Sequence, residues 1–174
     1  MTMNITPMKA ITAAVALSVL GVCASWAADE AKEHAELAKA LTATTVTLQT
    51  GLQASAATGT PISAKFEIDD GKLQLSIYTM KDSKFSEVVI NPTNGKVAKS
   101  EVITDKGDLD HAAAQKAAME KAKITLLAVA DKAGNGNAGY RLVSVMPELK
   151  DGLPQAIVTL ARGAEFKTVT EKLD

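Results

Sequence analysis

The chain is short of the residues on which much enzyme and metal chemistry depends. Its 174 residues include one cysteine and two histidines. With Cys23 alone, no disulfide can form within the chain, and beyond the apolar N-terminal stretch no thiol nucleophile is present. A serine nucleophile needs a histidine that is oriented by a third group, and neither His34 nor His111 lies in such a motif. The sequence therefore predicts a protein that is not an enzyme.

The charge balance excludes a second group of functions. The chain carries 19 Lys and Arg against 20 Asp and Glu, a formal net charge of −1 at pH 7. Proteins that bind nucleic acid or an anionic membrane surface concentrate positive charge, and this chain has no such excess. We therefore expect neither nucleic acid nor an anionic membrane surface among its partners.

The N-terminal residues have the pattern of a targeting segment. Apolar residues dominate positions 10–23, and Ser-Trp-Ala at 25–27 offers small residues where a signal peptidase reads. We predict a signal peptide over 1–27, cleaved after Ala27 or, as the next choice, after Ala28. Removing 27 of 174 residues leaves 147, with 18 basic and 20 acidic side chains. The expected location is periplasmic or secreted.

Two alternatives to a cleaved signal peptide remain open. An uncleaved anchor is disfavoured because the apolar run is shorter than the roughly 20 residues that span a bilayer. Lipidation at Cys23 is disfavoured because the bulky Val22 stands where lipidation signals have a small residue.

A duplication is the strongest positive signal in the sequence. The segment Ile62–Gly71 is answered 81 positions later by Val143–Gly152, and both end in Asp-Gly. The same offset relates several further pairs: Gln74 to Gln155, Ile77 to Val158, Phe85 to Phe166 and Val88 to Val169. A repeated supersecondary unit is the simplest explanation. We predict a first unit over 28–103 and a second over 104–174, each with its own leading helix.

Each unit opens with helical sequence. Alanine, glutamate and lysine favour helices over Asp29–Leu41 and Asp110–Lys123. A second helical signal follows in each unit, where Thr47 and Thr125 precede an apolar stripe and are good N-cap residues. The acidic stretch 105–110 is then interpreted as the linker between the units.

The rest of each unit alternates with the period of a β-strand. Three strands are expected per unit: Ile62–Ile68, Leu73–Ile77 and Phe85–Ile90 in the first, and Val143–Leu149, Gln155–Leu160 and Phe166–Thr170 in the second. The predicted fold is α+β, with two repeated units, each a helix followed by a three-stranded antiparallel meander. Pro147 and Pro154 predict edge or irregular strands in the second unit, because proline donates no ladder hydrogen bond. Joined and face-to-face sheets both remain open.

The first unit resembles the PepSY domain. The residues that carry the likeness are Thr47-Leu48, the strand that ends at Asp69-Asp70-Gly71, and the segment Glu87–Val97, a valine-rich strand running into Asn-Pro-Thr-Asn-Gly-Lys-Val. The likeness covers roughly 44–103 and is weaker over 122–174. It implies an extracytoplasmic α+β module, found in propeptides of secreted metalloproteases and in other envelope proteins. The roles proposed for the family are protease inhibition or regulation through binding, and it brings no catalytic residues.

The remaining candidate sites have simpler structural explanations. His34 and His111 occupy equivalent places, but a metal site usually needs three or four ligands, and two exposed histidines are the favoured interpretation. Asp69-Asp70 resembles a carboxylate pair, yet a hairpin turn explains it. The glycine-rich segment 134–139 follows a helix, whereas a phosphate-binding fingerprint follows a strand. We therefore predict no catalytic, cofactor-binding or metal-binding residue and no cofactor.

A binding role is the functional hypothesis that these patterns leave. Small meander units expose strand edges, to which an extended peptide can add as a further strand. The expected function is an exported, non-enzymatic binding module of the PepSY type that binds an envelope protein or peptide, with restraint of a protease as one form of that role. The alternative hypothesis is a periplasmic carrier of a small ligand or metal, working in the groove between the two units.

Overall fold

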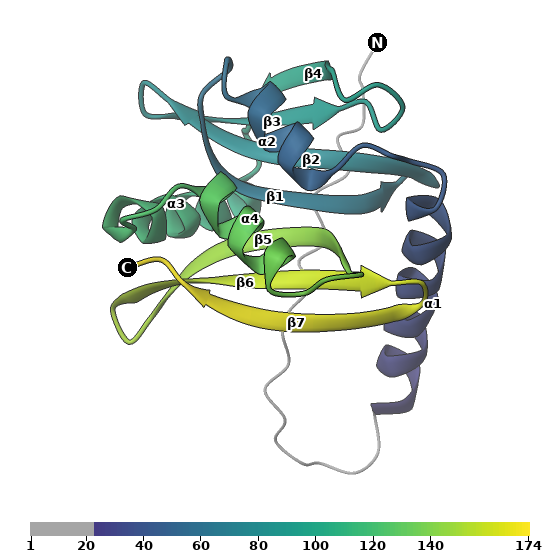
Figure 1. The fold of residues 1–174 in the computed structure, drawn as a ribbon. Helices are drawn as coiled ribbons and strands as arrows, with labels where there is room; N and C mark the ends of the chain where they lie inside the picture. The colour runs from purple at the N-terminus through teal and green to yellow at the C-terminus, as the bar shows by residue number, and fades with distance from the viewer. Residues whose placement is uncertain (1–22) are drawn as a thin grey trace.

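The computed structural model describes residues 23–174 as four helices and one sheet (Figure 1). In chain order the elements are α1 Cys23–Leu41, α2 Leu48–Ser55, β1 Thr60–Asp69, β2 Lys72–Lys81, β3 Lys84–Ile90, β4 Val97–Val102, α3 Lys106–Lys121, α4 Leu126–Asn135, β5 Arg141–Lys150, β6 Leu153–Arg162 and β7 Glu165–Lys172. Positions 1–22 of the predicted signal peptide lie outside the described residues, and positions 23–27 form the start of α1.

The predicted α+β class is confirmed, but the predicted pair of helix-plus-three-strand units is wrong. All seven strands form a single antiparallel sheet in the order β4-β3-β2-β1-β5-β6-β7. Each half contributes two helices, and the first half contributes a fourth strand, β4. The strand prediction followed residues that recur 81 positions apart, and β4 has no counterpart in that repeat. The two halves join because β1 and β5, which would be edges of separate meanders, pair with each other.

An approximate two-fold axis relates the two halves of the sheet. Ala64 of β1 pairs with Val145 of β5, which is its own counterpart in the repeat. The ladder also shifts by one residue at Ile62 and at Val143, again 81 positions apart. Antiparallel pairing of equivalent strands about a two-fold axis is the arrangement of an isologous dimer, here built within one chain.

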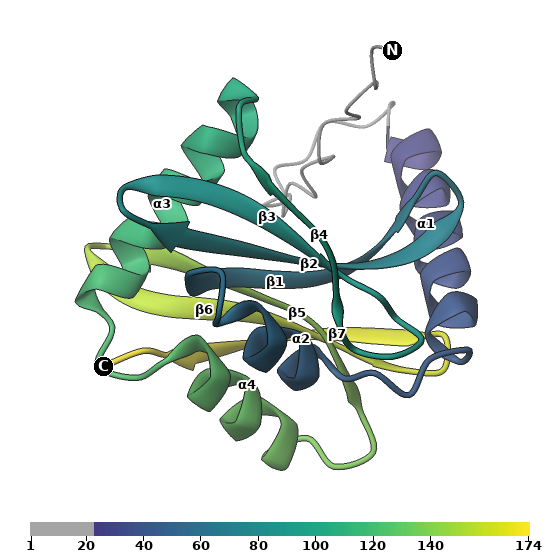
Figure 2. The same ribbon diagram turned by 90° about the horizontal axis from the view of Figure 1, so that it is seen from above.

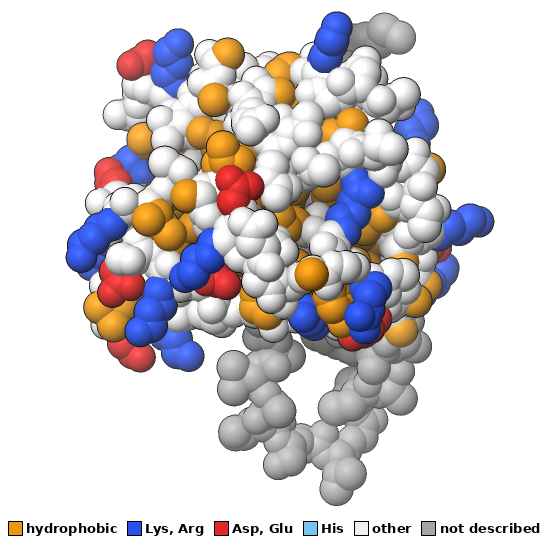
Figure 3. Space-filling model, in the orientation of Figure 1, with side chains coloured by type: hydrophobic (Ala, Val, Ile, Leu, Met, Phe, Trp, Pro, Cys, Tyr) orange, Lys and Arg blue, Asp and Glu red, His pale blue; other side chains and the backbone are white. Residues whose placement is uncertain are grey.

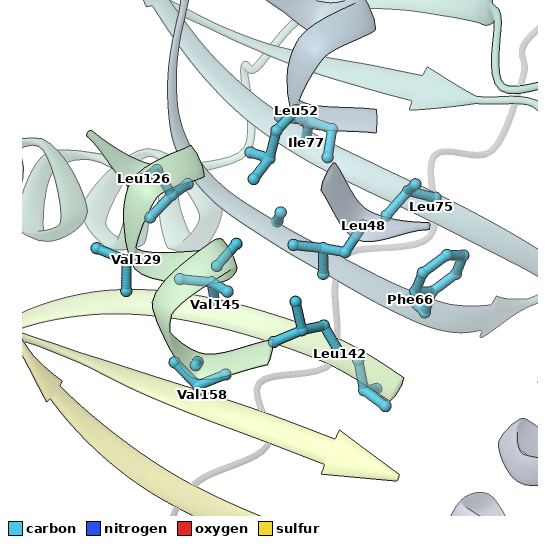
Figure 4. Close-up of a cluster of buried hydrophobic side chains, with 14 of the residues drawn as sticks. Leu48, Leu52, Phe66, Leu75, Ile77, Leu126, Val129, Leu142, Val145 and Val158 are labelled. Atoms are coloured by element: carbon cyan, nitrogen blue, oxygen red, sulfur yellow. The ribbon is translucent and has the colours of Figure 1, made fainter. Parts of the chain in front are cut away.

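Helices α2 and α4 cover the same face of the sheet, here called the front face (Figures 1 and 2). Apolar side chains of both helices are buried against strands of both halves (Figure 4). They include Leu48 and Leu52 of α2, Leu126 and Val129 of α4, and Ile77, Val145 and Val158 of the sheet. One continuous core therefore serves both halves. Burying each such side chain stabilises the fold by roughly 1.5–3 kcal/mol.

The other two helices, α1 and α3, lie at opposite ends of the sheet (Figure 2). On the back face, Ala112 of α3 forms a second apolar cluster with Ile62, Tyr78 and Ile103 of the first half. At the other end, His34 of α1 stacks on Phe166 of β7, with ring centroids 4.3 Å apart. Each leading helix therefore contacts strands of the other half, which interlocks the two repeats.

Local sequence signals place the starts of α2 and α4 correctly, whereas α1 begins at Cys23 and not at Asp29, and α3 begins at Lys106 and not at Asp110. Thr47 and Thr125 cap α2 and α4, accepting hydrogen bonds from the backbone N–H of Thr50 at 3.1 Å and of Ala128 at 3.2 Å. The prediction that 105–110 is a linker is wrong. Asp105 is the N-cap of α3 and accepts from the Asp108 N–H at 3.1 Å, so this acidic stretch opens the helix.

The proline prediction is also corrected. β5 lies between β1 and β6, and β6 lies between β5 and β7, so neither strand that contains a proline is an edge. The β1–β5 register covers Ala64 and Lys65 opposite Val145 and Ser144. Pro147 lies beyond that short stretch of pairing, where its missing N–H costs no bond to β1.

Candidate functional site

The two histidines do not come together. His34 is half-buried on α1 against Phe166, so the expectation that it is exposed is wrong, whereas His111 is exposed as expected, on α3 at the opposite end of the sheet. Among residues 23–174, no group of three or more His, Cys, Asp or Glu side chains could hold a metal ion. Nothing in their placement gives the two histidines a shared role.

The two remaining sequence candidates lie where simple chain connections require them. Asp70 and Gly71 form the β1–β2 turn with φ of 46° and 73°, and Asp151 and Gly152 repeat it with 52° and 77°. Backbone in this left-handed region explains the Asp-Gly pairs. The glycine-rich segment 134–139 ends α4 and leads into β5, as predicted.

Sequence reasoning missed a polar cluster on the back face of β1, β2 and β3. The Ser76 hydroxyl donates to Glu87 Oε1 at 2.7 Å, and the Gln74 amide donates to the Ser76 hydroxyl at 2.8 Å and to the same Glu87 oxygen at 3.3 Å. On β1, Lys65 and Glu67 form an ion pair at 3.0 Å with both side chains largely buried. Strand alternation already assigned Gln74 and Ser76 to one face, but the link to Glu87 depends on the β2–β3 register.

Burial dominates the electrostatics of this region. It raises the pKa of Glu87, an effect that the hydrogen bond from Ser76 partly offsets. Burial is also the main reason why the pKa of Asp108, on α3, is raised. The pKa of Tyr78 is raised by burial and then by the nearby Asp108 carboxylate. Burial therefore favours the protonated forms of Glu87, Asp108 and Tyr78.

The geometry of this cluster does not amount to a catalytic arrangement. The Ser76 hydroxyl faces a carboxylate and an amide, and no imidazole takes part in its described hydrogen bonds. A shallow pocket of about 390 Å³ lies elsewhere, lined by residues 56, 57, 59, 60 and 80–82, and holds none of the cluster side chains. We assign the cluster to the internal polar packing of the sheet.

The two edges of the sheet offer a different kind of site. β4 and β7 are the outermost strands of the described sheet. Every side chain of β4 is exposed, including Val97 at 40% and Val102 at 57%. Elsewhere on the described surface, the other large exposed apolar side chains are Leu149 and Leu153, which flank the Asp151-Gly152 turn. On the front face, charged and apolar side chains are interspersed (Figure 3).

The hydrogen bonds of the β3–β4 pair show which backbone groups of β4 point outward. The Ile103 N–H donates to the Phe85 carbonyl at 3.0 Å, so Ile103 faces β3. Residues along an antiparallel strand alternate between bonding to one side and to the other. Glu101 and Lys99 therefore also face β3, and the N–H groups of Ser100 and Val102 point away from the sheet. These groups are available to a further strand.

Comparison with protein-family models, with curated proteins and with solved structures finds no match. Within residues 23–174, the helices are too short or too polar to cross a membrane. The support for a function therefore comes from the geometry of the sheet edges and from the residues of the first half that resemble the PepSY domain.

Proposed function

We propose that the protein is an exported, non-enzymatic binding module of the PepSY type, which takes up an extended segment of an envelope protein or peptide as an additional strand beside β4. The observation that carries the proposal is the edge strand itself. β4 exposes two large apolar side chains, Val97 and Val102, together with outward-facing backbone donors and acceptors. Main-chain hydrogen bonds supply affinity in strand addition, and alternate side chains supply specificity.

The apolar pair on β4 favours an occupant with apolar side chains. Val102 lies opposite Ser86 and Val97 lies opposite Ile90, so both project on the front face near the two ends of β4. A strand beside β4 would cover both valines. At roughly 25 cal/mol per Å², covering two half-exposed valines contributes about 2 kcal/mol beyond the backbone hydrogen bonds. Restraint of a protease by such a contact is one form of this proposal.

The carrier alternative receives no support from a specific observation. It required a groove between the two units, and the backbones of β1 and β5 pair where the halves meet. On the front face α2 packs against α4 across the same boundary. Binding at an edge is therefore the function that the geometry favours.

Proline substitution provides a sharp test of the edge. Ser100→Pro removes one outward N–H from β4 without removing a hydrogen bond to β3, a position where edge strands tolerate proline. The matched control is Thr168→Pro, which alters the opposite edge of the sheet in β7. The protein from residue 28 onward, immobilised in each form, is exposed to envelope extract, and circular dichroism verifies that each variant folds.

The proposal predicts one protein or peptide that is retained by the unaltered chain and by Thr168→Pro, and lost with Ser100→Pro. Val102→Lys should weaken the same interaction about tenfold through the lost apolar contact. Equal retention by all forms, or retention by none, would overturn the assignment of binding to β4.

A further inference from the structure

The opposite edge of the sheet, β7, has properties that differ from those of β4. β7 pairs with β6 over eight consecutive residues without a register shift, from Glu165 to Lys172. The β3–β4 ladder, in contrast, shifts between Val89 and Ile90. A regular edge of this length can pair with another strand along all eight residues, whereas the shift limits the unbroken part of β4 to residues 99–102.

The hairpin geometry shows which groups of β7 face outward. Arg162 pairs with Glu165 across a two-residue turn, so the backbone groups of these two residues hydrogen-bond to each other. The backbone N–H and C=O of the next residue, Phe166, therefore point away from β6. Alternation then turns the backbone groups of Thr168 and Thr170 outward as well. Phe85, the counterpart of Phe166 in the first half, also faces outward, because its carbonyl accepts a hydrogen bond from the N–H of Ile103, directly after β4.

The side chains of β7 define the strand that would pair best with it. Lys167, Val169 and Glu171 share the front face, where Glu171 forms an ion pair with Lys132 of α4 at 2.8 Å. The Lys167 ammonium lies 3.9 Å from the centre of the Tyr140 ring, which holds it on that face. A complementary antiparallel strand needs an acid opposite Lys167, an apolar β-branched residue opposite Val169 and a base opposite Glu171.

β7 itself satisfies this requirement. Residues that lie directly opposite each other share a face, so a two-fold axis through Val169 sets Val169 against Val169. In that register Lys167 of each strand faces Glu171 of the other, and Thr168 faces Thr170. The neighbouring register that is centred on Thr168 instead sets Glu165 against Glu171, which is unfavourable because like charges are opposed.

We propose that β7 is the interface through which two copies of this chain associate, antiparallel, about a two-fold axis at Val169. The chain already contains a pairing of this kind, since β1 and β5 are equivalent strands joined antiparallel at Ala64 and Val145. In Figure 1 the first turns of α1 extend past the outer edge of β7, and Figure 2 places α1 toward the back of the sheet, so the helix lies to one side of the strand position. The dimer is one fourteen-stranded sheet with a β4 edge free at each end.

Charge exchange tests this register directly. Lys167→Glu alone sets two carboxylates against each other at the position opposite Glu171, and Glu171→Lys alone sets two ammonium groups against each other at the position opposite Lys167. Each single variant should therefore dimerise at least about tenfold more weakly than the unaltered chain. The double exchange restores both pairs, and so does an equimolar mixture of the two single variants. Sedimentation equilibrium of the chain from residue 28 onward, over about 1 μM to 1 mM, measures each association.

The expected result is a dimer for the unaltered chain, the double exchange and the mixture, and a loss of dimer for each single variant and for Thr168→Pro. Ser100→Pro should dimerise normally. A monomer for the unaltered chain throughout this range, single variants that dimerise as tightly as it does, or a dimer lost with Ser100→Pro but not with Thr168→Pro would each overturn the proposal. Circular dichroism of every variant identifies any loss of dimer that arises from unfolding. If Thr168→Pro proves to be unfolded, the two folded charge variants and their equimolar mixture decide the result.

Discussion

Arg141 gives the most direct test of how the two repeats are held together. It begins β5, in the second half, and its guanidinium donates to the carbonyl oxygens of Leu41 at 3.1 Å, Thr44 at 2.7 Å and Val46, all in the first half. The guanidinium also lies 5.2 Å from the centre of the Phe66 ring. Burial lowers the pKa of Arg141, but its ordinary value is so high that the group stays charged at pH 7.

Replacing Arg141 with alanine should cost about 3–5 kcal/mol of unfolding free energy. Each hydrogen bond to a charged group contributes about 1.5–3 kcal/mol, and three bonds from one group are not additive. The three carbonyls also end α1 and shape the connection to α2, so their loss loosens that connection. Arg141→Lys should recover part of the loss, because a lysine keeps the charge but not the planar fork of donors.

The chain offers a matched control in its other arginine, Arg162. Its partner is Glu165 at 2.8 Å, and both side chains are more than half exposed. Arg162→Ala should therefore change the free energy of unfolding far less than Arg141→Ala does, because water screens an exposed ion pair. Urea denaturation followed by circular dichroism measures both variants. A cost for Arg141→Ala that does not exceed the cost for Arg162→Ala would refute the view that Arg141 ties the halves together.

Two further predictions concern stability. Because burial raises the pKa of Glu87 above its ordinary 4.5, the folded state binds more protons than the unfolded state, and stability falls as the pH rises through that window. The midpoint of urea unfolding should therefore lie at a higher urea concentration for Glu87→Gln than for the unaltered chain at pH 7, and at the same concentration near pH 4. A Glu87→Gln variant that is less stable at pH 7 would contradict this explanation. Among the helical glycines, a Cβ on Gly51 would lie 2.5 Å from Leu75 Cδ2, whereas one on Gly134 meets no atom closer than 3.6 Å. Gly51→Ala should therefore lower the midpoint of thermal unfolding, and Gly134→Ala should raise the free energy of unfolding by up to about 1 kcal/mol. Calorimetry measures both midpoints, and a shift in the opposite direction for either variant would contradict the packing described for that glycine.

Much of the local structure could be predicted from the sequence. The 81-residue repeat matched β1 to β5 and β2 to β6 at the same bounds, and the Asp-Gly pairs at 70–71 and 151–152 form the expected turns. Thr47 and Thr125 start their helices as predicted. Stretch 105–110 was misjudged because its acidic residues also suit a solvated linker, and only the capping bond of Asp105 to Asp108 distinguishes a helix start.

The candidate sites were less predictable because they depend on which strands become neighbours. Nothing local indicated that Glu87 would receive hydrogen bonds from Gln74 and Ser76, or that Arg141 would reach across to Leu41 from about one hundred residues away. The choice of β4 and β7 as edges likewise required the β1–β5 pairing to be known. A strand's sequence gives its alternation, but not the identity of the strand beside it.

The sequence by itself determined the repeat, the α+β class, the turns and the starts of α2 and α4, because these features depend on interactions between residues a few positions apart. Only the tertiary structure decided that the halves share one sheet and one core, that the leading helices contact the opposite halves, and that β4 and β7 remain as edges. Those outcomes depend on contacts between residues tens of positions apart. Their free energy comes from burying faces that neither half can cover alone.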